Sequence, residues 1–185
     1  MDTVEAALAT VPRAGFLPAG SRERATYDGP VAIGHGQTNS QPRTVADMLR
    51  LLDPRPGQHV LDVGAGSGWT TALLAEMVGP TGSVTGVELV PDLAAWGEQN
   101  LRRTAYSWAQ VRTAEPGVLG LPAEAPFDRI LVSAAAGELP DALVDQLGRE
   151  GRMVLPVGGE MTLVVRSGDD IAVSGHGQYR FVPLR

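Results

Sequence analysis

Two short segments of the sequence carry groups that could bind and align a ligand. The first reads GHGQTNSQP over residues 34–42 and gathers amide and hydroxyl side chains just before a helix predicted from Pro42. The second reads VLDVGAGSGWT over residues 60–70 and places glycines at 64, 66 and 68. Glycines allow a tight turn and close approach of a ligand to the backbone, and the N-terminus of a following helix offers unpaired N–H groups. These two segments are the candidates for ligand binding.

The glycine segment is not a dinucleotide-binding fingerprint, which reads G-x-G-x-x-G/A. Its third small residue would fall at position 69, where the chain has Trp69. A large indole there would prevent close packing of helix against strand, which disfavours NAD and FAD. Glu88 ends the next predicted strand, where a carboxylate can accept hydrogen bonds from both hydroxyls of a ribose. The order of strand, glycine turn, helix, strand and acid therefore favours an adenosine-type ligand.

Each of these features also has a plainer interpretation. The glycines could form an ordinary tight turn, and Glu88 could be a solvated acid at the end of a strand. Asp62 could cap the turn, although its position just before the glycines suits a contact with a cationic amine. Ser40 could cap the helix that begins at Pro42, as serines often do.

The hydrophobic pattern predicts the elements that must position these loops. Strands are predicted over 59–64, 83–89, 109–115, 127–136 and 151–158, and helices over 1–10, 42–52, 69–79, 91–104 and 140–148. Strands and helices that alternate at this spacing predict an α/β fold of the Rossmann-like, doubly wound type, with a mostly parallel sheet and helices on both faces.

The two ends of the chain deviate from this alternation. Residues 18–41 are expected to be mostly irregular, and antiparallel edge strands are predicted over 161–167, 171–174 and 179–184. We therefore predict a single domain over residues 1–185. It comprises an N-terminal helical and substrate-loop segment (1–53), a ligand-binding core (54–160) and C-terminal antiparallel strands (161–185).

The composition excludes several classes of protein. The 185 residues, 43% of them hydrophobic, suit one domain with a core. A net charge of −6 argues against nucleic acid as a partner. No metal site is predicted, because the chain has no cysteine and no two histidines share a helix face. An acidic start without a secretory signal, and no apolar stretch of membrane-spanning length, predict a cytoplasmic protein without a membrane partner. The protein is also expected to be a monomer.

The sequence resembles the protein-L-isoaspartate O-methyltransferases, a family of S-adenosylmethionine-dependent enzymes with a Rossmann-like fold. The similarity runs through VPRAGFLP, GQTNSQP, VLDVGAGSGWTTALLA, GVEL, APFDRILVSAAA and GRMVLPVG to the terminal FVPL, in the order of that family and over nearly the whole chain. GQT-x-SQP followed by a G-x-G-S-G turn and APFDRI is a highly specific set.

The resemblance implies a site for each reactant. Ser40 takes the position of the active-site serine of the family, in a loop that receives the isoaspartyl carboxylate. The implied substrate-binding residues are Gln37, Thr38, Asn39, Ser40, Pro156 and Val182. The implied residues for S-adenosylmethionine are Asp62, Gly64, Ala65, Gly66, Ser67, Gly68, Glu88, Leu89, Glu115, Pro116 and Gly117. Trp69 stands where the family usually has tyrosine and is expected to pack beneath the glycine turn.

Methylation of a carboxylate explains why no catalytic triad is visible. An isoaspartyl or aspartyl carboxyl group has a pKa near 4 and is already an anion at neutral pH. It needs no general base, so catalysis can depend on the alignment of carboxylate oxygen, methyl carbon and leaving sulfur. Hydroxyl and amide groups such as those of residues 37–40 can align a carboxylate without deprotonating anything.

Two positions depart from the family pattern. The family carries a GDG segment whose aspartate contacts the adenine, and Pro116 stands in place of that aspartate, between Glu115 and Gly117. Asn39 stands where the family prefers an apolar residue, which could indicate a different peptide preference.

The resemblance implies the repair of isoaspartyl residues in aged proteins, in which the methyl ester collapses to a succinimide. The two departures leave other functions as alternatives. One alternative is methylation of a normal aspartate in a dedicated peptide, which gives an aspartimide in a natural product. Another is a binding module whose methyl-donor site has decayed. A nucleic-acid methyltransferase is disfavoured by the acidic charge.

The Pro116 departure gives a first prediction. We expect Pro116→Asp to tighten S-adenosylmethionine binding about tenfold, because one restored hydrogen bond is worth about 1–2 kcal/mol. Isothermal titration calorimetry of both proteins measures this change. An unchanged dissociation constant would contradict the interpretation of Pro116.

Overall fold

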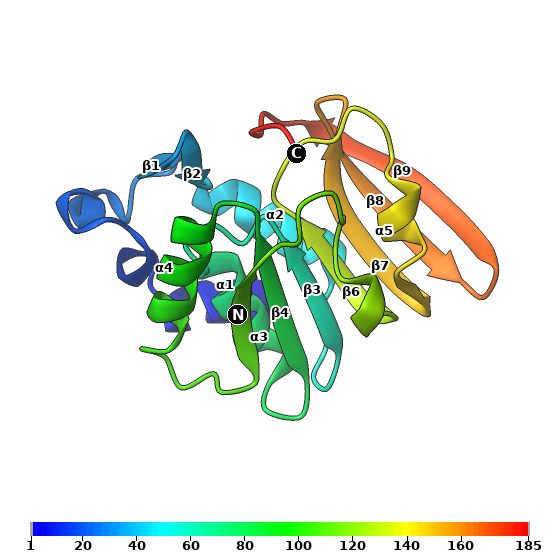
Figure 1. Ribbon diagram of the computed structural model, residues 1–185, viewed down its shortest axis with the longest axis horizontal. Coiled ribbons are helices and arrows are strands. Elements are labelled where there is room, and N and C mark those ends of the chain that lie inside the picture. Colours follow the sequence, from blue (N-terminus) through cyan, green and yellow to red (C-terminus); the bar gives the residue numbers. More distant parts are fainter. Residues whose placement is uncertain (1, 185) are drawn as a thin grey trace.

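The computed structural model describes residues 2–184 and contains a seven-stranded sheet in the order β5-β4-β3-β6-β7-β8-β9 (Figure 1). The strands of this sheet are β3 (His59–Val63), β4 (Ser83–Glu88), β5 (Ala109–Thr113), β6 (Phe127–Val132), β7 (Leu147–Val157), β8 (Glu160–Ser167) and β9 (Asp170–Gln178). The neighbours from β5 to β7 pair in parallel, while β8 and β9 join by antiparallel pairing. The predicted α/β fold with a mostly parallel sheet is confirmed.

The order of the strands creates a switch point in the middle of the sheet. From β3 the chain proceeds outward to β4 and β5, and it then returns to β6 on the other side of β3. In open α/β sheets, ligands bind in the crevice beyond the carboxyl ends of the strands at such a point. The predicted glycine loop follows β3 directly, so it lies at this crevice.

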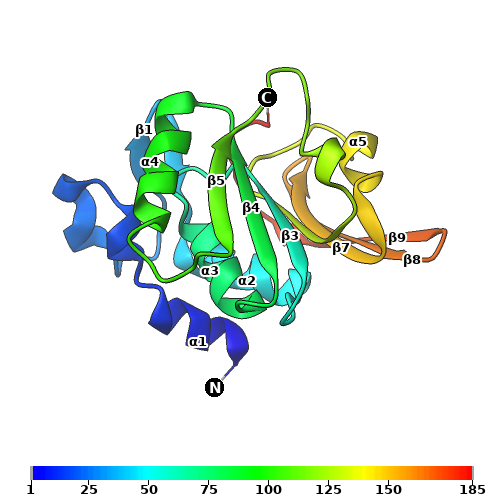
Figure 2. The same cartoon turned by 60° about the horizontal axis from the view of Figure 1, so that its bottom comes forward.

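Four helices contribute to the core on one face of the sheet. They are α1 (Thr3–Thr10), α2 (Pro42–Leu52), α3 (Trp69–Val78) and α4 (Pro91–Leu101). On α2 the apolar residues recur at helical spacing and are buried: Val45, Met48, Leu49 and Leu52. Figure 2 shows α4 beside β5, with α2 and α3 behind the sheet. Among residues 2–184, none of the helices combines the length and the apolar character needed to cross a membrane.

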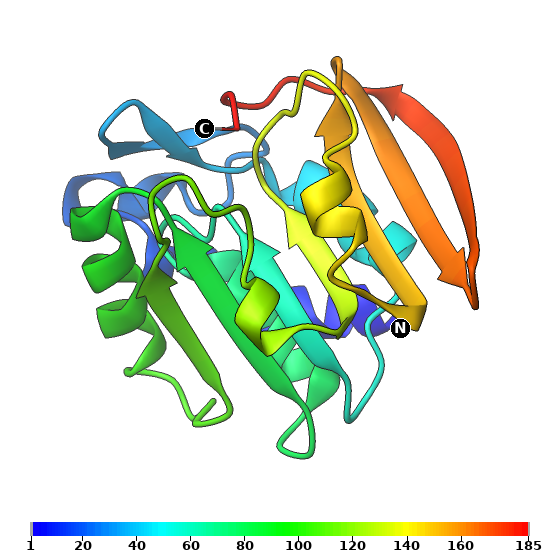
Figure 3. The same cartoon turned by 45° about the vertical axis from the view of Figure 1, so that its right-hand side comes forward.

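The opposite face is covered mainly by loops and short helices. The helix predicted over 140–148 is only one turn, α5 (Asp141–Val144), and in Figure 3 it lies in front of the sheet. After this turn the buried Gln146 donates to the carbonyls of Leu119 and Ala142 and accepts from the Leu121 N–H. The strand β7 then begins directly at Leu147. The 3-10 helix η3 (Pro122–Glu124) lies in the preceding connection.

The segment expected to be irregular contains more structure than predicted. Residues 13–24 form two 3-10 helices, η1 (Arg13–Phe16) and η2 (Ala19–Arg24). Two strands, β1 (Val31–Gly34) and β2 (Gln37–Asn39), then form an antiparallel hairpin. The turn of this hairpin uses left-handed backbone conformations at Gly34, His35 and Gly36, which glycines adopt easily. The hairpin places residues 36–40, which we call the GQTNS loop, at the edge of the crevice.

The prediction of an antiparallel edge strand over 179–184 is wrong. β9 ends at Gln178, and the chain then crosses toward the loop after β6. There Ala135 donates its N–H to the Val182 carbonyl, and Leu184 donates its N–H to the Ala135 carbonyl, each at 2.8 Å. These bonds form a parallel bridge between Ala135 and Pro183. The C-terminal residues therefore form a wall at the carboxyl end of the sheet.

Asp62 fixes the strand β3 against the helix α3. Its side chain is fully buried, and Oδ2 accepts hydrogen bonds of 2.7 Å from the hydroxyls of both Thr70 and Thr71. Burial raises the pKa of Asp62 to about 6, and nearby Glu88 also raises it, while the two threonines lower it. Its Oδ1 atom has no hydrogen-bond partner among the described residues.

This raised pKa predicts how stability depends on pH. A carboxyl group whose pKa is higher in the folded protein stabilises the fold below its unfolded pKa, and this contribution is lost as the pH rises through the folded value. For Asp62 the window runs from about pH 4 to about pH 6. We expect the unfolding free energy of the wild type to fall by about 2–3 kcal/mol relative to that of Asp62→Asn between pH 4 and 7. Urea unfolding at each pH measures it, and parallel profiles for the two proteins would show that Asp62 is not responsible.

Candidate functional site

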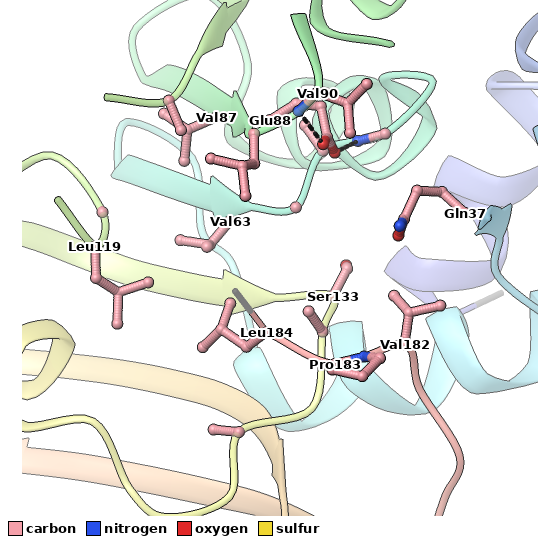
Figure 4. A pocket seen from close by; sticks show the side chains of 18 of the residues that line it. Gln37, Val63, Val87, Glu88, Val90, Leu119, Ser133, Val182, Pro183 and Leu184 are labelled. Atoms are coloured by element: carbon pink, nitrogen blue, oxygen red, sulfur yellow. Dashed lines mark hydrogen bonds between the residues drawn. The ribbon is translucent and has the colours of Figure 1, made fainter. Parts of the chain in front are cut away.

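One large cavity of about 1070 Å³ lies at the carboxyl ends of the central strands. The β1–β2 hairpin, the glycine loop, the loops after β4, β5 and β6, and the C-terminal segment all contribute to its lining. Figure 4 shows Gln37 from the hairpin and Val182 from the C-terminal segment on the side of the cavity opposite Leu119. The two loops that are predicted from the sequence to bind a ligand therefore face one cavity.

Most of the predicted site residues line this cavity. They are Gln37, Thr38, Asn39, Ser40, Gly64, Ala65, Gly66, Ser67, Glu88, Leu89, Glu115, Pro116, Gly117 and Val182. Asp62, Gly68 and Pro156 do not line it. Asp62 is turned toward Thr70 and Thr71 beneath the loop, and the hydroxyls of both threonines donate to its Oδ2 atom. Pro156 is buried and accepts a hydrogen bond from the Ala136 N–H, which positions the cavity wall behind the lining.

The glycine loop is shaped by its own backbone and by Glu88. Gly64, Gly66 and Gly68 have φ angles of 79°, 52° and 84°, in the left-handed region that favours glycine. Glu88 accepts from the Gly66 N–H at 3.0 Å through Oε2 and from the Val90 N–H at 2.9 Å through Oε1 (Figure 4). Each carboxylate oxygen can accept a second hydrogen bond. Glu88 thus fixes the loop and retains acceptor capacity toward the cavity.

The glycine loop also touches α4 closely. A Cβ atom on Gly97 of α4 would lie 2.7 Å from the carbonyl oxygen of Gly66, and one on Gly68 would lie 2.9 Å from the carbonyl oxygen of Gly97. Neither residue can be larger without a shift of backbone. Gly68, which does not line the cavity, therefore serves the packing of the loop against α4.

Ser40 lies between the hairpin and the helix α2 and is half-buried at the cavity. The alternative that it caps α2 is wrong, because the N-cap residue is Gln41 and the cap has no side-chain hydrogen bond. Pro42 begins the helix, where its missing N–H costs nothing.

The buried Arg13 holds this loop and was not among the site residues predicted from the sequence. Its guanidinium group donates to the carbonyls of Tyr27, Gly29, Asn39 and Ser40 at 2.8–3.0 Å and to Oδ1 of Asn39 at 2.6 Å. Only 4% of Arg13 is exposed, and burial lowers the pKa of its guanidinium. The segment VPRAGFLP gives the signal that could have found it: an arginine between apolar residues, which needs internal acceptors if buried.

Trp69 occupies the space between Arg13 and the glycine loop. The indole is 3% exposed, donates to the Val11 carbonyl at 3.1 Å and has the Arg13 guanidinium 5.5 Å from its ring centre. The indole is therefore buried against the N-terminal segment, and Trp69 also belongs to the cavity lining. A cation over an indole face is an attractive arrangement, so Trp69 connects the N-terminal segment to the start of α3.

The loop after β5 forms the side of the cavity opposite the hairpin. Pro116 and Gly117 line it, and Gly117 has a φ angle of 81°. Ala114 donates its N–H to the Glu88 carbonyl at 2.9 Å, which places this loop next to the acid. Further along, the buried Gln146 binds the backbone of Leu119 and Leu121. The lining residues Leu119, Ser133 and Leu184 come from three distant segments, so no local pattern indicated them.

The charges of the cavity have one sign. The acidic residues Glu88, Glu115, Glu138 and Asp141 line it. Among the described residues, no lysine, arginine or histidine belongs to the lining. Such a cavity favours a ligand with positive charge. An anionic group entering the same space would need a positive charge brought by another ligand.

The comparisons with known proteins agree with the arrangement of these loops. A family model for protein-L-isoaspartate(D-aspartate) O-methyltransferase (PCMT) matches residues 1–185. The protein-L-isoaspartate O-methyltransferase of Methanopyrus kandleri is 47% identical over 99% of this chain and 83% of its own length. The enzyme of that name from Methanothrix thermoacetophila is 44% identical over 99% of this chain and 88% of its own. The one from Aeropyrum pernix is 51% identical, but the match covers 82% of this chain and 58% of that protein.

Solved structures show the same fold. A Plasmodium falciparum protein in complex with S-adenosyl-L-homocysteine, described as a protein-L-isoaspartate O-methyltransferase, superposes with a TM-score of 0.86 and 28% identity. The superposition covers all of this chain and 91% of that one. A second protein-L-isoaspartate O-methyltransferase gives a TM-score of 0.88 over all of this chain and 62% of that one, at 22% identity, which bears on the fold alone. The chain belongs to the protein-L-isoaspartate(D-aspartate) O-methyltransferase family.

Proposed function

We propose that this protein transfers the methyl group of S-adenosylmethionine to the α-carboxylate of L-isoaspartyl residues in damaged proteins or peptides. The resulting methyl ester can collapse to a succinimide without further enzymatic help, so the activity is one of repair. The observation that carries the proposal is the meeting of the glycine loop, Glu88 and the GQTNS loop in one cavity. Whole-chain relatives named for this activity support it.

The residues of the glycine loop fit a methyl donor of the nucleoside type. Glu88 retains acceptor capacity for ribose hydroxyls, and the left-handed glycines leave the backbone accessible beside it. Leu89, 39% exposed, adds an apolar surface at the cavity where an adenine ring can pack. Glu115 and Gly117 flank Pro116 at the edge assigned to the adenine. When bound, the methyl donor supplies the electrophile, a methyl carbon attached to a positively charged sulfonium sulfur.

The substrate loop fits the second reactant. Gln37, Thr38 and Ser40 line the cavity with an amide and two hydroxyls that can donate hydrogen bonds to a carboxylate. Ser40 acts by orienting the ionised carboxylate oxygen toward the methyl carbon, not by removing a proton. Val182 lies on the same side in Figure 4 and adds an apolar contact for the peptide. Because the reacting geometry must be linear, small errors in this alignment cost rate.

The acidic lining affects the order in which the two reactants bind. The substrate carboxylate meets four acidic residues in the cavity, so its attraction depends on the positive charge of the bound methyl donor. As the methyl group is transferred, the positive sulfonium and the negative carboxylate neutralise each other. A site that keeps water away favours a reaction that consumes charge in this way.

The aspartate-specific alternative depended on Pro116 and on Asn39, which was interpreted as a change at the substrate surface. The Asn39 side chain is 5% exposed and bonds to Arg13 and Ser67 inside the protein. It therefore gives no support to a different peptide preference. The alternative of a decayed methyl-donor site depended on Pro116. The cavity beside that residue is large, so its size gives no support to this alternative.

The choice of substrate is tested with two versions of one peptide. We expect methyl transfer to an isoaspartyl peptide to exceed transfer to its aspartyl counterpart by at least about a hundredfold in kcat/KM, because only the former presents an α-carboxylate on the extended backbone. Transfer of a radiolabelled methyl group measures both rates. Equal rates, or a preference for the aspartyl peptide, would overturn the repair assignment.

Calorimetry with S-adenosylhomocysteine tests the methyl-donor site separately, since no heat would indicate a decayed site.

The role of Ser40 gives a further prediction. We expect Ser40→Ala to lower kcat/KM for the isoaspartyl peptide about tenfold or more, through loss of one hydrogen bond to an anionic oxygen. Affinity for S-adenosylhomocysteine should stay within threefold of the wild type. Ser174→Ala, on the exposed strand β9, is the matched control and should retain wild-type activity. Equal activity of Ser40→Ala and the control would remove Ser40 from the site.

A further inference from the structure

The side chain of Asn39 connects the two loops that bind the two reactants. Its Oδ1 atom accepts a hydrogen bond of 2.6 Å from Nε of Arg13, and its Nδ2 atom donates one of 3.1 Å to the hydroxyl of Ser67. Ser67 is 2% exposed and lies in the middle of the glycine loop. Both ends of the amide are therefore engaged inside the protein, between the hairpin and the glycine loop.

This connection is extended at both ends by further buried groups. On one side, Arg13 also holds the carbonyls of Asn39 and Ser40. On the other, Asn100 of α4 donates to the Ser67 carbonyl at 3.1 Å and is 3% exposed. A continuous polar chain thus runs from η1 to α4 through Arg13, Asn39, Ser67 and Asn100.

Within the described part of the chain, the bond from Asn39 to Ser67 is the one hydrogen bond that joins residues 37–41 to residues 64–68. An apolar side chain at position 39 would break it and would also remove the acceptor of Arg13 Nε. A buried guanidinium N–H without an acceptor is costly, so the loop would have to shift to satisfy it. The position of Ser40 relative to the glycine loop therefore depends on this one amide.

We propose that Asn39 is a positioning residue: it sets the distance between Ser40 and the methyl-donor loop by bridging buried Arg13 to Ser67. The inference rests on the proposed function for its effect on rate. It assigns Asn39 a role inside the protein, because the residue is 5% exposed and its amide bonds to Arg13 and to Ser67. Methyl transfer requires linear alignment of three atoms, so a loop displaced by a fraction of an ångström reduces the rate even when both reactants bind.

The test is a double-mutant cycle with Asn39→Leu and Ser67→Ala. The leucine has a similar size and removes both bonds of the amide, while Ser67→Ala removes only the bond to the glycine loop. At saturating methyl donor and isoaspartyl peptide, we expect each change to lower kcat at least about tenfold. The double variant should be no slower than Asn39→Leu alone, because both changes break the same bond. Gln99→Leu, at an exposed position of α4, is the control and should keep wild-type kcat.

A second readout distinguishes positioning from loss of stability and needs no peptide. Hydrogen–deuterium exchange of the protein bound to S-adenosylhomocysteine should show faster exchange at residues 37–41 in Asn39→Leu than in wild type. All measurements are made well below the unfolding temperature of each variant, and the affinity for S-adenosylhomocysteine should change less than threefold.

The outcomes separate this inference from the proposed function. Additive effects of the two changes on kcat, or unchanged exchange at residues 37–41, would overturn the positioning role of Asn39. A wild-type protein that methylates no isoaspartyl peptide would instead refute the proposed function. In that case the exchange experiment alone still decides whether Asn39 holds the loop.

Discussion

The buried guanidinium of Arg13 is the interaction on which the substrate side of the site depends. A charge removed from water must be compensated by hydrogen bonds or by an opposite charge. Arg13 makes no ion pair with a carboxylate of the described residues, and it receives its compensation from four carbonyls and one amide oxygen. Those acceptors can be supplied only if the hairpin and the residues before it fold around the arginine. The cost of leaving Arg13 unsatisfied thus selects one conformation of the GQTNS loop.

The methyl-donor side depends on the same principle with the opposite charge. Glu88 is 7% exposed and obtains its hydrogen bonds from two backbone N–H groups, at Gly66 and Val90. The left-handed glycines make this arrangement possible, because residues with a Cβ atom would be strained there. On both sides of the cavity a buried charge organises backbone, and on both sides small polar groups remain at the surface of the cavity. The amide of Asn39 joins the two arrangements through Ser67.

The chemistry that this protein family performs explains why the site can do without a catalytic base. A carboxylate nucleophile is ionised at neutral pH, so the protein needs to align it and to exclude water. The acidic lining of the cavity would repel a carboxylate on its own, whereas a positive sulfonium makes the same lining compatible with it. The charge pattern, which at first argues against an anionic substrate, therefore fits a reaction between an anion and a cation.

The sequence by itself determined the features that are encoded locally. The glycine spacing, the acid after the second strand, the amphipathic face of α2 and the alternation of strands and helices all follow from short-range periodicity and backbone conformation. The tertiary structure decided what depends on residues far apart in the chain: the acceptors of Arg13 come from positions 14–27 residues later, and the segment after β9 pairs with the loop after β6. Asp62 also shows this limit, because the two hydroxyls at the start of α3 that hydrogen-bond its carboxylate could not be read from its position before the glycines. Local patterns fix backbone conformation, but the partner of a buried polar group is set by the free energy of the whole packed structure.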